Sequence, residues 1–146
     1  MGKIIAVCTS EKKGERKKNV GEAAFQVNHG IVGDAHAGDW HRQVSLLAVE
    51  SIKKMQDKGL DVGPGDFAEN ITTEGIKVAK LPVGTKVRLG DEVLCEVTQI
   101  GKVCHDRCAI YYQAGDCVMP KEGIFVKVLE DGKVRVGDGL VVVKDD

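Results

Sequence analysis

The chain has 146 residues and a mass of 15.7 kDa, and 42% of its residues are hydrophobic, so we expect a single domain over residues 1–146 that buries its own core. Its formal net charge of −1 gives no overall positive field, which argues against nucleic acid as a partner. No apolar run reaches the roughly 20 residues of a membrane-spanning helix, which argues against a membrane protein.

The first apolar stretch, KIIAVCTS, predicts a strand over Lys3–Cys8. It is short for the apolar part of a secretory leader and no small-residue cleavage site follows it, so we expect a cytoplasmic protein with reduced thiols. The next stretch, EKKGERKKN, predicts a polar loop over residues 11–19. We expect its basic residues to be solvent-exposed or to form a rim that attracts anions: Lys12, Lys13, Arg16, Lys17 and Lys18.

The middle of the chain predicts a strand at Ala23–Val27, a long glycine-rich loop and then a helix over Ser45–Lys58. The helix is predicted because apolar residues recur on roughly one face, and Gly59 is a suitable end signal. The apolar residues are Leu46, Leu47, Val49, Ile52 and Met55.

Short Val- and Ile-rich stretches bounded by Gly or Asp fill the rest of the chain, beginning with a strand near Glu69–Thr72. They are TKVRLG, EVLCEVTQI, GIFVKVLE, GKVRVGD and GLVVVKD. The Asp-Gly pair of EDGK, residues 130–133, predicts a tight hairpin. Many short strands with one helix predict a mostly β fold, a closed or partly closed barrel or a sandwich, with one main helix near 45–58 and few short helical turns.

The segment GKVCHDRCAIYYQAGDCVMPKEG, residues 101–123, concentrates reactive side chains, including Cys104, Cys108 and Cys117. On a strand, Cys104 and Cys108 would lie about 13 Å apart, too far for a disulfide. Three interpretations stay open: a zinc site completed by histidines, buried apolar thiols, or a reactive thiol that a nearby cation activates. The remaining cysteines, Cys8 and Cys95, lie in apolar strand patterns and are expected in the core.

A second group of polar residues lies in HGIVGDAHAGDWHRQVSLL, just before the predicted helix. Glycines there permit close backbone approach to a ligand, and Arg42 could bind a phosphate beside the helix N-terminus. We expect this loop and the cysteine segment to face one cavity, because only these two regions concentrate reactive polar groups. The alternative is a solvated loop whose polar residues cap turns.

Taken together, GIVGDAHAGDWHRQVSLL, PGDFAENITTEGI, LPVGTKVRLGDEVLCEVTQIGKVCHDRC, GDCVMPKEGIFVKVL and VGDGLVV resemble, in that order, the MOSC domain found at the C-terminus of molybdenum cofactor sulfurases. The resemblance covers nearly the whole chain and indicates a short stand-alone member of bacterial type. It implies a β-barrel that binds the molybdenum cofactor (molybdopterin) or carries sulfur for its maturation.

The resemblance also implies a working cysteine. Arg107-Cys108 matches the family's Arg-Cys motif, so Cys108 is our first choice as catalytic thiol and metal ligand, ahead of Cys104 and Cys117. The expected cofactor-binding residues are Gly33, Asp34, His36, Gly38, Arg42, Asn70, His105 and Arg107. No pyridoxal-phosphate lysine motif is present, so the sulfur donor would be a separate pyridoxal-phosphate-dependent cysteine desulfurase, and further partners would be cofactor biosynthesis proteins or molybdoenzymes.

These features leave the enzyme class open between a sulfurtransferase and a component of a molybdenum-cofactor-dependent oxidoreductase. The competing hypotheses are a non-catalytic barrel that serves as an interaction module with a structural zinc site, and a thiol redox sensor that uses Cys104, Cys108 and Cys117.

Overall fold

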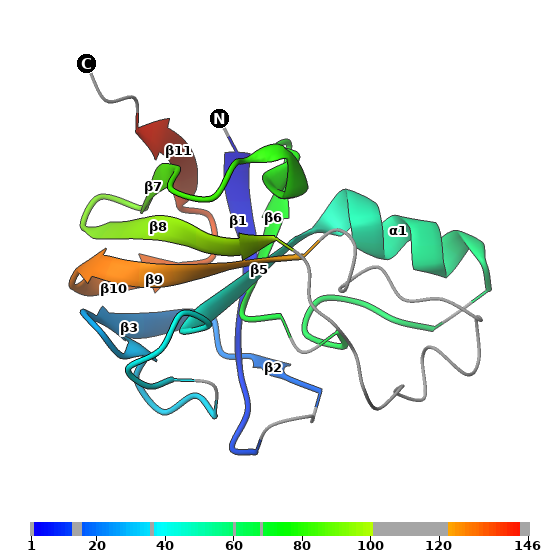
Figure 1. Ribbon diagram of the computed structural model, residues 1–146. Helices are drawn as coiled ribbons and strands as arrows, with labels where there is room; N and C mark the ends of the chain where they lie inside the picture. The colour runs from blue at the N-terminus through cyan, green and yellow to red at the C-terminus, as the bar shows by residue number, and fades with distance from the viewer. Residues whose placement is uncertain are drawn as a thin grey trace.

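The computed structural model describes residues 2–12, 16–35, 37–59, 61–67, 69–100 and 123–143. Seven strands close into a barrel: β1 (Gly2–Thr9), β5 (Val44–Ala48), β6 (Ile71–Glu74), β7 (Lys86–Leu89), β8 (Val93–Ile100), β9 (Ile124–Glu130) and β11 (Gly139–Val143) (Figure 1). Around the barrel their order is β1-β11-β7-β8-β9-β5-β6, and β6 pairs with β1 to complete the circle. Neighbours are antiparallel except β5 and β6, which are parallel.

Four further strands extend this barrel. β2 (Lys18–Asn19) pairs with the end of β1, and β3 (Glu22–Gln26) pairs with both β4 (Gly30–Ile31) and β10 (Gly132–Arg135). The barrel and the strand positions expected from the sequence are therefore confirmed.

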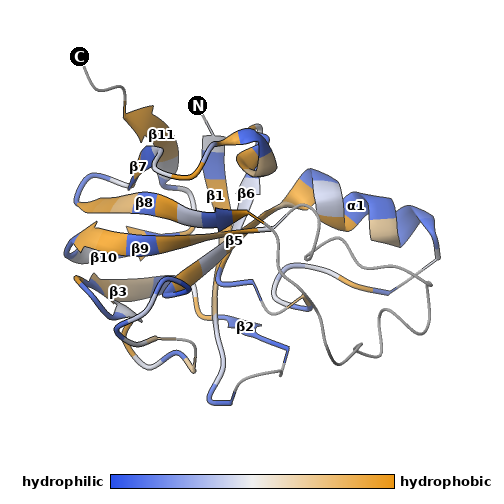
Figure 2. Cartoon of the chain, in the orientation of Figure 1, coloured by the Kyte–Doolittle hydropathy of each residue, from blue (hydrophilic) through white to orange (hydrophobic). Residues whose placement is uncertain are grey.

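The barrel interior is the main core, and it follows from the alternation of side chains along each strand. In β8, Val93, Cys95 and Val97 are fully buried, whereas the residues between them are partly exposed. Figure 2 shows the resulting apolar strands around the interior. Cys8 and Cys95 are both buried free thiols, as their apolar surroundings predicted.

The predicted helix start at Ser45 is wrong. Val44–Ala48 forms strand β5, and the helix α1 occupies Val49–Asp57. All five residues of β5 are buried, because it lies between β6 and β9 and is covered on both faces. A strand buried on both faces is a continuous apolar run, which periodicity cannot distinguish from a buried helix.

The hairpin predicted at EDGK is also wrong. β10 follows β9 after Asp131, but it pairs with β3, in a register that joins Gly132 to Phe25. Gly132 has a different use: a Cβ there would overlap the side chain of Glu92, so glycine lets the chain cross close to β8.

Helix α1 lies outside the barrel, and its apolar side forms a second cluster there (Figures 1 and 2). The cluster contains Leu47, Ile52, Met55, Val62, Phe67 and Phe125. Within the described part of the chain, no helix has the length and apolar character needed to cross a membrane.

The approach of β4 to β5 depends on glycine at position 30. Gly30 has a φ of 111°, and a Cβ there would lie 2.6 Å from the carbonyl oxygen of Gln43. Gly21 has a φ of 82° but open space around it. Alanine substitutions at the two positions can therefore be compared: both place alanine at a positive φ, but only the one at Gly30 also brings a Cβ into overlap with a neighbouring backbone atom.

We predict that Gly30→Ala lowers the free energy of unfolding by about 3 kcal/mol or more, and Gly21→Ala by only about 1 kcal/mol. Urea unfolding of the two variants measures the difference. Equal losses would show that the Gln43 backbone can move away without cost.

Candidate functional site

Four neighbouring residues on the outside of the barrel form what we call the outer row: Asn70, Ser45, Phe125 and Gln99. Ser45 is paired with Phe125, and Phe125 with Gln99, across β5, β9 and β8. The Asn70 N–H donates to the Ser45 carbonyl oxygen at 3.1 Å. Strands lie about 4.8 Å apart, so the row spans about 14 Å.

Ser45 and Phe125 face outward because their chain neighbours face the barrel interior. Val44 and Leu46 belong to the main core, which places Ser45 on the opposite face of β5. Phe125 belongs to the second cluster under α1. The outer row is therefore covered by loops and α1 rather than by the barrel.

Asn70 is the most connected residue of the row. Its Oδ1 accepts from the Ser45 N–H at 3.0 Å and from the Ser45 hydroxyl at 3.2 Å, and its Nδ2 donates to the Cys8 carbonyl oxygen at 3.0 Å. The Cys8 N–H donates to the Asn70 carbonyl oxygen. Asn70 thus joins β1 to β5 at the start of β6, and it is fully buried.

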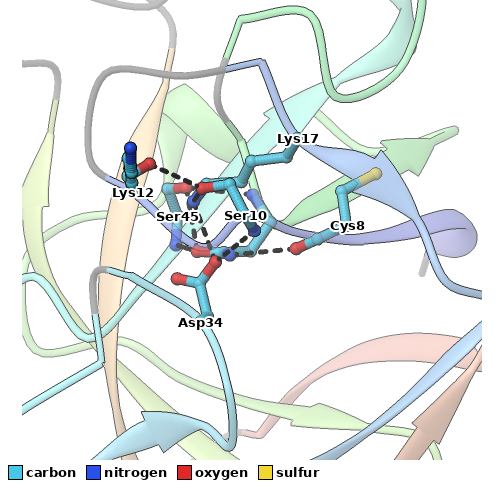
Figure 3. Close-up of polar contacts among 7 residues, drawn as sticks. Cys8, Ser10, Lys12, Lys17, Asp34 and Ser45 are labelled. Atoms are coloured by element: carbon cyan, nitrogen blue, oxygen red, sulfur yellow. Dashed lines mark hydrogen bonds and ion pairs between the residues drawn. The ribbon is translucent and has the colours of Figure 1, made fainter.

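Next to Asn70 lies a buried ion pair between Lys17 and Asp34 (Figure 3). The Nζ–Oδ1 distance is 2.8 Å and both side chains are inaccessible to solvent. The Lys17 ammonium also donates to the Ser10 hydroxyl at 2.8 Å, and the Ser10 N–H donates to Asp34 at 3.1 Å. The expectation that Lys17 belongs to a solvated loop is wrong.

The electrostatics of Asp34 follow from these contacts. Burial alone would raise the pKa of its carboxyl, but the hydrogen bond and charge of Lys17, helped by hydrogen bonds from Ser10 and Asn70, hold that pKa below 3.8. Asp34 is therefore ionised at neutral pH and its charge is matched inside the protein.

Gly65 holds the Lys17 loop in place. The Lys17 N–H donates to the Gly65 carbonyl oxygen at 2.8 Å. Gly65 has a φ of 90°, and a Cβ there would overlap the Lys17 carbonyl oxygen and approach the Cys8 sulfur. The GPGDFAEN stretch thus needs a glycine for close packing, rather than for a phosphate loop.

Glu69 is fully buried beside this group. Its Oε2 accepts from the Thr72 hydroxyl at 2.8 Å, whereas its Oε1 has no hydrogen-bond partner among the described residues. Burial raises the pKa of this carboxyl above 4.5, although the Gly65 N–H and the Thr72 hydroxyl oppose the change. At a given pH, Glu69 is therefore protonated to a greater extent in the folded protein than in the unfolded chain.

Arg42 lies at the other end of the outer row. Its Nε donates to Gln99 Oε1 at 3.1 Å, and its guanidinium carbon lies 5.2 Å from the centre of the Phe125 ring. The His41 Nε2 lies 3.0 Å from the same Gln99 oxygen. Gln99 lies two residues before the segment 101–122 in the sequence and Phe125 three residues after it, so Arg42 contacts the described chain on either side of that segment.

Burial makes the described thiols unreactive. It raises the pKa of Cys95 to about 12 and the pKa of Cys8 to about 12. In residues 2–100 and 123–143, as far as the structure describes them, no group of three or more His, Cys, Asp or Glu side chains could hold a metal ion.

The predicted site residues have different outcomes. The structure brings Asp34 and Asn70 together, and it places Arg42 at the far end of the same row. Gly33 and Gly38 lie in the loop between, with φ values of 87° and 156°. Six predicted residues lie outside the described ranges, so their roles remain predictions: His36, Cys104, His105, Arg107, Cys108 and Cys117.

Sequence reasoning missed Lys17, Ser10, Ser45 and Glu69. The sequence did not single out Lys17, because a run of five basic residues does not show which of them forms the ion pair with Asp34. Arg42 does not precede a helix N-terminus, because β5 separates it from α1. A dipole from α1 therefore does not assist Arg42 in binding an anion.

The fold and the outer row define a small β-barrel domain with a group of polar residues on the outside of the barrel. The sequence model of the MOSC domain matches residues 33–141, and the chain belongs to that family. No curated protein sequence matches the chain.

Solved structures with the same fold cover nearly the whole chain. The YUAD protein from Bacillus subtilis has a TM-score of 0.78 at 17% identity, over 96% of this chain and 94% of its own. YiiM from Geobacillus stearothermophilus has a TM-score of 0.70 at 18% identity, and the match covers 99% of this chain and 76% of that protein. YiiM from Escherichia coli has a TM-score of 0.69 at 20% identity, and the match covers 100% of this chain and 71% of that protein. At these identities the likeness shows the fold.

We predict that Lys17→Met lowers the free energy of unfolding by about 3–5 kcal/mol at pH 7, because Asp34 stays buried without its partner. The loss should shrink as the pH falls, because protonation removes the unmatched charge of Asp34. Urea unfolding at pH 7 and pH 4.5 measures both effects. The exposed neighbour variant Lys18→Met is the control, and a loss that does not depend on pH would contradict the explanation.

We predict that Glu69→Gln stabilises the protein at neutral pH. The raised pKa means that the folded chain keeps a proton that the unfolded chain releases above pH 4.5, which costs about 1.4 kcal/mol per pH unit until the folded-state pKa is reached. Glutamine carries no such cost, so the gain should grow as the pH rises above 4.5, level off above the folded-state pKa and vanish at lower pH. The exposed variant Glu74→Gln is the control, and a Glu69→Gln variant that is less stable than the unchanged protein at pH 8 would refute the assignment.

Proposed function

We propose that this domain binds the molybdenum cofactor, or carries sulfur for its maturation, through a cysteine of the segment 101–122 beside the outer row. The observation that supports this most directly is the position of Arg42, which contacts Gln99 and Phe125, residues near the two ends of that segment. MOSC family membership relates the chain to molybdenum cofactor metabolism and agrees with this chemistry.

The residues around Arg42 suit an anionic cofactor. Gln99 engages Nε and the Phe125 ring supports the guanidinium, while the two terminal amino groups have no hydrogen-bond partner among the described residues. These amino groups would hold the pterin phosphate through hydrogen bonds. Because the guanidinium is already positioned, little side-chain freedom is lost on binding.

When bound, the cofactor supplies a soft molybdenum–dithiolene centre that accepts thiolate or sulfide ligands. We propose Cys108 as the thiol that meets it, followed by Cys104 and Cys117. Cys8 and Cys95 do not compete for this role, because each is fully buried and has a pKa near 12. The Arg42 charge would favour a nearby thiolate as well as the phosphate.

In the sulfur-carrier form of the proposal, the donor is a separate pyridoxal-phosphate-dependent cysteine desulfurase in the cytoplasm. The receiving thiolate attacks the terminal sulfur of the donor's persulfide, a new S–S bond forms, and the donor leaves as a thiolate. Electrons balance without an added oxidant. The persulfide would then be delivered to a molybdenum cofactor protein or a molybdoenzyme.

We predict that the chain, produced in cells that make the cofactor and purified without oxygen, retains molybdenum and pterin in equal amounts. Arg42→Gln should weaken cofactor retention by about ten- to a hundredfold, because it removes charge-assisted hydrogen bonds. Arg42→Lys should be intermediate because it keeps the charge and loses the planar fork. Lys53→Gln, on the exposed side of α1, is the control.

The serine variants of Cys104, Cys108 and Cys117 identify the thiol. Cys108→Ser should abolish molybdenum retention, or the gain of one sulfur atom seen by mass spectrometry after incubation with desulfurase and cysteine. If only Cys104→Ser does so, Cys104 has the role. Zinc in place of molybdenum, or a disulfide among these cysteines as the sole modification, would refute the proposal.

A further inference from the structure

We infer a second ligand site, separate from the outer row, in a cavity between α1 and the chain that follows β6, and we assign to it a small organic anion with an apolar body. The cavity has a volume of about 640 Å³. That is within the roughly 300–1,000 Å³ of typical small-molecule sites. It is lined by Ala48, Glu50, Ser51, Lys54, Gly75, Ile76, Lys77, Val78, Ala79 and Lys80.

The walls of the cavity are held by the fold. Val78, in the 3-10 helix η1 (Val78–Lys80), is 1% exposed and belongs to the barrel core. Glu50 of α1 accepts from the Gly75 N–H at 3.0 Å, which ties the helix to the opposite wall. Ile76 packs so closely on Gly2 that a Cβ there would lie 2.5 Å from its Cγ2. A cavity with fixed walls binds a ligand without first being ordered.

The lining combines an apolar surface with a positive charge. Ala48, Ile76, Val78 and Ala79 provide contacts for hydrocarbon or an aromatic ring. Three lysines line the cavity against one acidic residue, Glu50, whose Oε2 is already bound to Gly75. Two of the lysines, Lys77 and Lys80, are exposed at the rim.

These features select the ligand class. An apolar neutral molecule would make no use of the charges of Lys77 and Lys80, and an inorganic anion would make no use of the apolar walls. A carboxylate, sulfonate or phosphate attached to a hydrophobic body satisfies both.

The cavity and the outer row use different sides of α1. Ile52 and Met55 pack into the second cluster with Phe125, whereas Glu50, Ser51 and Lys54 line the cavity. None of the residues of the outer row, nor Arg42, lines the cavity. The inference therefore goes beyond the proposed function and does not depend on it.

The test uses 8-anilino-1-naphthalenesulfonate, an aromatic anion whose fluorescence rises in apolar surroundings, and its uncharged analogue N-phenyl-1-naphthylamine. We expect the sulfonate to bind the folded full chain more tightly than the analogue, and its affinity to fall as salt is added. In amide NMR spectra of the labelled chain, the largest shifts should lie at residues 48–54 and 75–80.

Three variants decide the outcome. The double variant Lys77→Gln/Lys80→Gln should weaken sulfonate binding by about tenfold, and Ala79→Phe should abolish it by filling the cavity. The matched control Lys53→Gln/Lys133→Gln, which removes two exposed lysines elsewhere, should bind normally. Thermal unfolding confirms that each variant is folded. Equal weakening by both double variants, equal binding of the two probes, or shifts that map outside the cavity would overturn the inference.

Discussion

The buried pair of Lys17 and Asp34 is the interaction that places the loops of this domain. Removing two charges from water costs more than a surface pair would recover, so the pair is a poor source of stability. It does exclude other arrangements, because either charge left alone inside the protein would be strongly unfavourable. Ser10, Asn70 and Gly65 add hydrogen bonds and close packing to the same point. We infer that the pair selects one loop arrangement on an already stable barrel.

The position of Arg42 is a consequence of that constraint. Seven residues lie between Asp34 and Arg42, and both ends of this connection are fixed: Asp34 by Lys17, and Arg42 by Gln99 and Phe125. The next residue, Gln43, is bound to the barrel, because its side-chain oxygen accepts a hydrogen bond from the Val128 N–H at 2.9 Å. The two ends of this connection are thus held at different places, one by Ser10 and Lys17 and the other by Gln99 of β8. Arg42 is therefore held in place by contacts at both ends of this connection.

The sequence was sufficient for the barrel, because alternating Val and Ile side chains and glycine boundaries are local signals. It failed where neighbours in space decide the structure. Val44–Ala48 could not be distinguished from a helix without knowing that β6 and β9 flank it. The Asp-Gly pair marked the boundary between β9 and β10 but not the partner of β10. For the site, Asp34, Asn70 and Arg42 were visible in their motifs, whereas Lys17 and Glu69 become distinctive only through burial.

Helix α1 separates the outer row from the cavity, and it determines whether the two can influence each other. Ile52 and Met55 are 0% and 1% exposed, so the helix is anchored on the Phe125 side. Glu50 anchors it on the Gly75 side. A ligand in one place changes affinity in the other only if it favours a different helix position. Because the Phe125 ring also contacts the Arg42 guanidinium, any such movement of the helix would first change the position of Arg42. A helix fixed at both faces has little freedom to move, so the two sites should bind their ligands additively.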